Sequence, residues 1–143
     1  KMLKHNLIIL GQGSEKKYLE SIATSNVKFY GHVNDVEKFM LNSSAFISSS
    51  YSEGLPMAVI EAMSYGLPCI ISDINPHIEI KELIGEGVFL FENNKYESLI
   101  DSLNILIQYD ELSIHRMISN SFNNNLSTTK MVENYQKIYS IFK

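Results

Sequence analysis

Cysteine and long apolar runs are scarce in this chain of 143 residues, and each scarcity excludes a class of protein. A single cysteine excludes a disulfide within the chain, and no spacing of histidine and cysteine resembles a metal site. We therefore expect a reducing, cytoplasmic setting. No apolar stretch approaches the roughly 20 residues of a membrane span, and the amino end has no basic-then-apolar leader, so we expect a soluble chain.

Positive charge is also in short supply. Lysine and arginine number 12 against 16 acids, which gives a net charge of -4 and argues against nucleic acid as a partner. Hydrophobic residues make up 45% and charged residues 20%, as in ordinary soluble proteins, and a chain of this length fits one domain. Because a strand begins at Leu7 almost without lead-in, we expect residues 1–143 to be a piece of a longer protein.

What the chain does have is a regular alternation of short apolar runs and helical patterns. Strands are predicted at Leu7 to Leu10, Val27 to Tyr30, Ala45 to Ser48, Cys69 to Ser72 and Val88 to Phe91. Helices are predicted at 14–25, 35–42, 56–66, 96–107, 110–122 and 128–142, with Asn123 to Asn125 as a loop. This order predicts an α/β fold, a doubly wound parallel sheet with helices on both faces.

In such a sheet, ligands bind beyond the carboxyl ends of the strands, so the connections that follow the strands are the candidate sites. They contain Gly11-Gln12-Gly13, Gly31-His32-Val33, the segment from Ser49 to Gly54, and the segment from Asp73 to His77. We interpret the first as a turn, because a dinucleotide fingerprint would need a third glycine where Lys16 stands. His77 is interpreted as an ordinary loop residue.

Glu61 is the most informative residue of the chain. It interrupts a helix that is apolar on every side, the pattern of a helix packed between a sheet and its neighbours. Its neighbours three and four positions away include no lysine or arginine. We therefore expect a buried carboxylate that either pairs with a distant basic group or accepts hydrogen bonds from a ligand in a crevice.

The start of the same helix suits an anion. Backbone N–H groups from about Gly54 to Ala58 are free at a helix amino end, where the helix dipole also favours negative charge. Gly54 permits close approach to the backbone, and Pro56 fixes the entry of the chain without removing a useful donor. Glu61 lies roughly 6 Å along the axis from Met57, so a ribose diol beside a phosphate fits.

The string from Glu53 to Pro68 resembles the signature of the group 1 retaining glycosyltransferases, the large family 4 of enzymes with the GT-B fold. Two glutamates separated by seven residues, Glu53 and Glu61, are its hallmark. The segment from Val27 to Val33 is similar to the strand-then-glycine segment of that family. Nearly the whole chain is covered, although only the central motif is specific.

The resemblance implies a hexosyltransferase-type enzyme that moves a sugar from a nucleotide-diphosphate donor to an acceptor sugar or lipid-linked glycan, in surface polysaccharide or glycoconjugate assembly. It implies that this chain is the carboxy-terminal, donor-binding half, partnered by a missing amino-terminal domain and peripheral at the inner membrane surface. Glu61 would bind the ribose, and Glu53 would be the catalytic acid that faces the sugar. The backbone of Gly54, Leu55, Pro56 and Met57 would face the sugar and diphosphate, and Gly31, His32 and Val33 the base, with no metal or other cofactor.

One departure from that family bears on activity. Its members supply an arginine and a lysine for the diphosphate from a segment upstream of where this chain begins, and no lysine or arginine stands between Lys38 and Lys81. Since stabilising the departing diphosphate is the main catalytic task, we expect the isolated chain to be inactive.

Other interpretations stay open. Glu53 also fits a solvated acid that the helix dipole favours at a helix start. For the whole chain, the main alternative function is a glycosyltransferase-like module that binds a nucleotide or a partner without catalysis. A phosphoacceptor receiver domain needs acids after the first strand and an aspartate ending the third. This chain has Gly11-Gln12 and Ser48-Ser49 there, which argues against that class.

Overall fold

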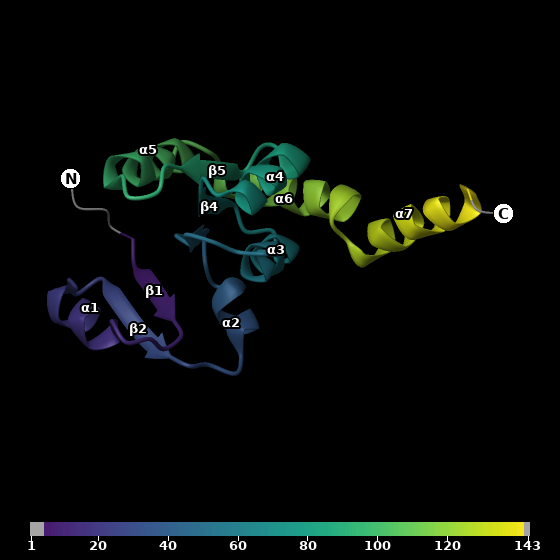
Figure 1. Cartoon of the computed structure of the whole chain (residues 1–143). Coiled ribbons are helices and arrows are strands. Elements are labelled where there is room, and N and C mark those ends of the chain that lie inside the picture. Colours follow the sequence, from purple (N-terminus) through teal and green to yellow (C-terminus); the bar gives the residue numbers. More distant parts are fainter. Residues whose placement is uncertain (1–4, 142–143) are drawn as a thin grey trace. The chain divides into compact units, whose positions relative to one another are not determined.

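The computed structural model describes residues 5–141, which form two compact units, one through Phe39 and one from Met40 onward. The amino-terminal unit contains β1 (Leu7–Leu10), α1 (Lys16–Ile22) and β2 (Val27–Gly31), and α2 (Val36–Met40) follows at its end (Figure 1). The carboxy-terminal unit continues with β3 (Phe46–Ser48), α3 (Met57–Ser64), β4 (Cys69–Ser72), α4 (Asn75–Ile84), β5 (Val88–Phe91), α5 (Tyr96–Leu106), α6 (Glu111–Asn125) and α7 (Thr128–Ile141).

The amino-terminal unit is a βαβ unit. β1 and β2 pair in parallel, with Leu7 opposite Val27, and the register shifts after Ile9 so that Leu10 faces Gly31. Gly31 has a φ of 69°, which a glycine adopts without strain, and its carbonyl accepts a hydrogen bond of 2.7 Å from the N–H of Gly11. This hydrogen bond therefore joins the connection after β1 to the connection after β2.

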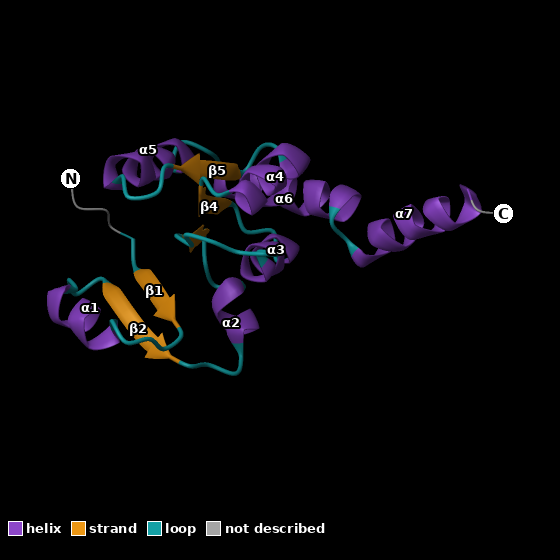
Figure 2. Cartoon of the chain, viewed as in Figure 1, coloured by secondary structure: helices purple, strands orange, loops and turns teal. Residues whose placement is uncertain are grey.

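The carboxy-terminal unit is built on a three-stranded parallel sheet in the order β3-β4-β5 (Figure 2). All four residues of β4 are buried, because this central strand is covered on both faces. When successive right-handed crossovers each lead to the next strand on the same side of a parallel sheet, their helices lie on the same face of that sheet. α3 and α4 accordingly both contact α6, while α5 packs on β4 and β5.

The core of this unit is apolar and close-packed. α3 contributes Val59, Ala62 and Met63, and α6 contributes Ile114 and Ile118, all at 2% exposure or less. Cys69 is a small core residue, and burial raises the pKa of its thiol.

Two glycines permit the close contact of α6 with its neighbours. Gly66 (φ 78°) and Gly87 (φ 87°) have left-handed backbone, and a β-carbon would lie 2.5 Å from Ser119 Oγ at the first and 2.6 Å from Ile118 Cδ1 at the second. Both positions therefore require glycine for conformation and for space.

The predicted α/β class with parallel strands is confirmed, and each predicted strand lies within one residue of the observed one. β1 and β2 pair within the amino-terminal unit, and β3, β4 and β5 pair within the carboxy-terminal unit. Two details were wrong. α4 begins at Asn75, so Asn75 to His77 are helical, because Pro76 occupies the first turn and needs no donor there. α6 continues through Asn123 to Asn125, where the Asn125 side chain donates to the carbonyl of Ser121, 2.9 Å away.

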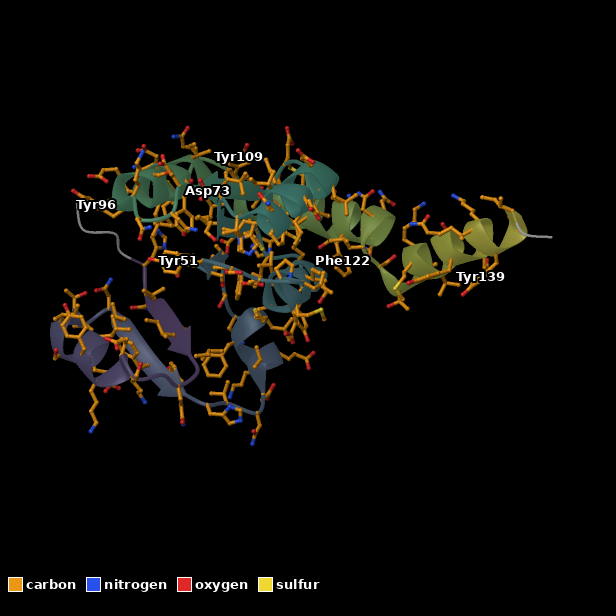
Figure 3. All side chains as sticks on the ribbon, in the orientation of Figure 1. Tyr51, Asp73, Tyr96, Tyr109, Phe122 and Tyr139 are labelled. Atoms are coloured by element: carbon orange, nitrogen blue, oxygen red, sulfur yellow. The ribbon has the colours of Figure 1, made fainter. Side chains whose placement is uncertain are left out.

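α7 carries an exposed apolar face. The spacing of Met131, Tyr135, Ile138 and Phe142 in the sequence predicts one helix face that packs. Met131, Tyr135 and Ile138 are 51–54% exposed, and α7 has no buried residue (Figure 3 labels Tyr139 of the same helix). Phe142 lies outside the described residues. Across residues 5–141, every helix is too short or too polar to cross a bilayer.

The start of α6 provides a pH-dependent prediction. The carboxylate of Asp110 accepts hydrogen bonds from the side chain and the backbone N–H of Ser113, and these bonds lower its pKa below the ordinary 3.8. A lowered pKa means that the cap stabilises the fold fully above the unfolded-state value and that this contribution is lost as the pH falls through the folded-state value. Asp110→Ala is therefore expected to lower the melting temperature at neutral pH, and the deficit relative to the wild type is expected to shrink in acid. Circular dichroism measures both, and Asp110→Asn, which caps without titrating, is the control. A deficit that does not change with pH would contradict the assignment.

Candidate functional site

Three connections meet at the carboxyl edge of the β3-β4-β5 sheet. The Ser72 hydroxyl donates a 2.6 Å hydrogen bond to the carbonyl of Ser50, and the Tyr51 hydroxyl donates a 2.8 Å bond to Asn94 Oδ1. Asp73 Oδ1 accepts a 3.1 Å bond from the N–H of Asn93. Tyr51 and Asp73, labelled in Figure 3, thus belong to one network across connections that are far apart in sequence. The network fixes the backbone from which Glu53 projects.

His77 and Glu53 lie at the centre of this edge. His77 is completely buried, and its Nδ1 lies 2.9 Å from the carbonyl of Ser72. Its Nε2 lies 3.7 Å from Glu53 Oε1, and Nε2 has no hydrogen-bond partner in the part of the chain that the structure describes. The Glu53 side chain keeps 22% of its surface exposed. Glu53 therefore has one side against a buried imidazole and the other open.

The amino end of α3 has free donors. No side chain caps this helix, and within residues 5–141 the N–H groups of Gly54, Leu55 and Ala58 have no acceptor. The predicted set was larger than the observed one, because Pro56 has no N–H and Met57 donates to the carbonyl of Leu55 at 2.8 Å. Three unpaired donors at a helix start still form a site suited to an anion.

Glu61 is exposed, so the expectation of a buried carboxylate was wrong. The expectation of a helix covered on every side was wrong for the same reason: α3 buries Val59, Ala62 and Met63 and leaves the face of Met57, Ala58 and Glu61 open. The apolar character of that open face misled the sequence argument. No ion pair of Glu61 occurs among the described residues, so it is not a structural acid held by an internal cation.

The residues around Glu53 are open to solvent in a way that packing does not require. A β-carbon on Gly54 would meet no atom within 4 Å, and its backbone is outside the left-handed region. Leu55 and Met57 are 65% and 60% exposed, whereas Pro56 is buried and its carbonyl accepts from Val59 and Ile60. Pro56 thus anchors the segment, and the folded chain itself gives no reason for glycine at position 54.

The remaining predicted binding residues belong to the amino-terminal unit. Gly31 is buried at the end of β2, His32 is exposed and Val33 is half-buried. Beside them the connection from Gly11 to Lys16 surrounds a hollow of about 270 Å³. That Gly31, His32 and Val33 face the base stays a prediction.

Two lysines bear on the expected shortage of cations. Lys81 donates to the carbonyls of Gly85 and Val88, 2.9 and 2.7 Å away, so it is used at the end of α4. Lys95 follows β5 and so stands at the carboxyl edge, where the sequence argument missed it. Its ammonium lies 2.6 Å from Glu92 Oε1, which neutralises part of its charge.

A metal cluster was not expected, and in residues 5–141 no three His, Cys, Asp or Glu side chains lie close enough to hold an ion. The absence of a metal requirement stays a prediction. A second hollow of about 420 Å³ lies against α6, and neither Glu53 nor Glu61 lines it. Its lining residues are Ile84, Glu86, Met117, Asn120, Ser121, Asn124 and Asn125.

Comparison with known proteins gives concordant results. Residues 3–124 match the family described as glycosyl transferases group 1. The chain is 37% identical over 114 residues to an uncharacterized glycosyltransferase of Haemophilus influenzae, an alignment that covers 75% of this chain and 32% of the relative. It is 33% identical over 112 residues to the UDP-Gal:alpha-D-GlcNAc-diphosphoundecaprenol alpha-1,3-galactosyltransferase of Escherichia coli, covering 78% of this chain and 28% of the relative. The chain thus spans less than a third of the length of these relatives.

Solved structures agree in fold. The apo form of the lipopolysaccharide outer core galactosyltransferase WaaB superimposes with a TM-score of 0.71 at 24% identity, covering 94% of this chain and 40% of that one. TarM gives a TM-score of 0.70 at 22% identity, covering 94% and 28%. At these identities the similarity establishes the shared architecture.

Proposed function

This chain belongs to the group 1 family of glycosyl transferases, and we propose that it supplies the donor site of a retaining enzyme. The enzyme moves a hexose from a nucleotide-diphosphate sugar to an acceptor hydroxyl, and this chain is its carboxy-terminal, nucleotide-binding domain. A preceding domain of the same protein, together with the acceptor it holds, completes the site.

The observation that carries the proposal is the open face of α3. Glu61 is exposed and without an ion pair in the described residues, on the same helix whose amino end presents unpaired N–H groups at Gly54, Leu55 and Ala58. A carboxylate accepts two hydrogen bonds from a vicinal diol, and the helix start favours a phosphate. One helix thus provides groups for both the ribose and the diphosphate of a nucleotide sugar.

Each remaining residue has a role in this proposal. Glu53 contacts the transferred sugar near the reacting carbon, and the backbone from Gly54 to Met57 follows the diphosphate. The exposed surface at Gly54 supports this placement, since neither packing nor φ requires glycine there. Gly31, His32 and Val33 contact the base.

The acceptor is proposed from the relatives. The names of relatives from Escherichia coli and Campylobacter jejuni specify sugars on diphosphoundecaprenol and diphospho-undecaprenol carriers, and others act in O-antigen or lipopolysaccharide synthesis. We propose a lipid-linked glycan acceptor and an enzyme that works in the cytoplasm at the inner membrane surface. Full activity of the longer protein on soluble acceptors, with no binding to lipid vesicles, would contradict this.

A second candidate function is a module that binds a nucleotide without catalysis. It is favoured because the lysines near the proposed site already have partners within the chain. Lys81 is used by backbone carbonyls and Lys95 is paired with Glu92. The full-length gene distinguishes the two functions. An enzyme is expected to encode an arginine and a lysine for the diphosphate upstream of this chain, whereas a module without catalysis is not.

Calorimetric titration tests the proposed site directly. We expect this chain to bind one of UDP, GDP and ADP, and Glu61→Ala to weaken that binding about ten- to a hundredfold, since hydrogen bonds to a charged group contribute about 1.5–3 kcal/mol. Glu79→Ala, which removes an exposed carboxylate from α4, is the control and should bind as the wild type does. Binding that is absent for all three nucleotides, or unchanged in Glu61→Ala, would refute the proposal.

A further inference from the structure

The buried imidazole of His77 has an unused nitrogen that faces Glu53. A carbonyl oxygen only accepts, so the 2.9 Å contact of Nδ1 with the Ser72 carbonyl assigns a hydrogen to Nδ1. The Ser72 hydroxyl is 3.1 Å from the same nitrogen, but its own hydrogen goes to the carbonyl of Ser50. Every contact on this side of the ring is therefore a donation by Nδ1.

Nε2 is left with nothing to bind except the Glu53 carboxylate. A buried polar nitrogen without a hydrogen-bond partner destabilises the fold relative to a paired one. A bare lone pair facing a bare carboxylate oxygen is repulsive as well, so the arrangement lacks one hydrogen. A small rotation of the partly exposed Glu53 side chain would shorten the 3.7 Å separation to hydrogen-bonding distance, whereas His77 is fixed by its burial and by Ser72.

We propose that His77 is a positioning residue for Glu53: a hydrogen on Nε2 is shared with Glu53 Oε1 and turns the carboxylate toward the donor sugar. The chain of contacts runs from the Ser50 carbonyl through Ser72 and His77 to Glu53, and it joins the connections after β3 and β4. Glu53 keeps its second oxygen for the sugar. The role in catalysis rests on the proposed function, whereas the shared hydrogen does not.

Apart from the contact between His77 and Glu53, the ion pairs of the described chain involve neither residue. α4 is packed against β5, which has no ionisable side chain, and against α6. The ionisable side chains of α4, α6 and the connections after β4 and β5 include Asp73, Glu79, Lys81, Lys95, His115 and Arg116. Lys81 and Lys95 already have partners, and His115 Nε2 lies 3.4 Å from the Ser44 carbonyl.

Nitrogen NMR of the imidazole rings tests the shared hydrogen without any ligand. In this chain at neutral pH, the His77 Nε2 signal is expected to be that of a hydrogen-bearing nitrogen and to move to the lone-pair range in Glu53→Gln, while Nδ1 is unchanged. Glu79→Gln, the same chemical change on the exposed side of α4, should move neither signal, and His115 is an internal reference. The same Nε2 signal in the wild type and in Glu53→Gln would overturn the proposal.

Kinetics of the full-length protein tests the positioning role. His77→Ala is expected to lower kcat about tenfold, because misplacing a catalytic group by about 1 Å has effects of this size or larger. His77→Gln, whose amide reaches the place of Nε2, should recover most of the rate, and both variants should bind nucleoside diphosphate as the wild type does. The double variant Glu53→Gln/His77→Ala should be no slower than Glu53→Gln alone.

Additive losses in that double variant, or no recovery by glutamine in a protein with wild-type circular dichroism, would overturn the positioning role. Failure of the proposed function has a different signature, since Glu61→Ala would then leave nucleotide binding unchanged whatever the ring spectrum shows.

Discussion

Glu53→Gln is expected to lower the kcat of the full-length enzyme by about a hundred- to a thousandfold, the size seen when one electrostatic contact to a transition state is removed. Positive charge develops at the sugar carbon as its bond to the diphosphate breaks. A carboxylate beside that carbon stabilises the charge, whereas an amide of the same shape does not. Since the Glu53 side chain is partly exposed, the substitution should not disturb the core.

Initial rates with the cognate donor, alongside nucleotide affinity, measure this effect. The affinity for the nucleoside diphosphate should stay within about threefold of the wild type, because the proposed contacts to that part of the donor come from Glu61 and the start of α3. Glu79→Gln serves as the matched control. A kcat that is unchanged in Glu53→Gln would assign Glu53 to the solvated start of α3 and remove it from the chemistry.

The strands could be predicted from the sequence because each is a short apolar run bounded by polar or glycine residues, and β4 is buried on both faces. A run of about four residues has the length of a buried strand and is too short for an ordinary helix. The strand order β3-β4-β5 could not be predicted this way, since hydrogen bonding between strands depends on contacts distant in sequence.

The environment of Glu61 shows where composition misleads. Met57 and Ala58 are apolar, so α3 was interpreted as buried all round, yet both residues lie on the open face beside Glu61. Apolar residues on a helix face indicate burial against something, and that partner need not belong to the same unit. The burial argument therefore failed for Glu61, and the role that the motif spacing implies for it stays a prediction.

His77 and Lys95 were accessible to sequence reasoning. Asn75-Pro76 is a helix-start signal that places His77 on the first turn of α4, next to the end of β4. Lys95 follows a predicted strand and so lies at the carboxyl edge of the sheet. The burial of His77 could not be predicted, because it depends on side chains that are distant in sequence. Lys95 and Glu92, in contrast, are three residues apart in one connection, so their pairing is a local contact.

This chain by itself is expected to give no measurable sugar transfer, at least a thousandfold below the full-length protein. The chain spans less than a third of its relatives, and the resemblance assigns the acceptor site and the upstream arginine and lysine to the part that precedes it. Within the described residues, Lys81 is engaged with carbonyls, and Glu92 offsets part of the charge of Lys95, so the neutralisation of a departing diphosphate is weak. Each lost contact of this kind costs on the order of a hundredfold or more, and the loss of acceptor positioning adds to it.

Mass spectrometry of the glycosylated acceptor, together with release of the nucleoside diphosphate, measures the difference between the two proteins. Calorimetric binding of the nucleotide to this chain is the control for folding, because it separates an intact donor site without catalysis from a site that never formed. Transfer by the isolated chain at a rate near that of the full-length protein would mean that leaving-group stabilisation comes from within residues 1–143. Lys95 would then be the first residue to substitute, since it is the cation that the fold places at the carboxyl edge of the β3-β4-β5 sheet.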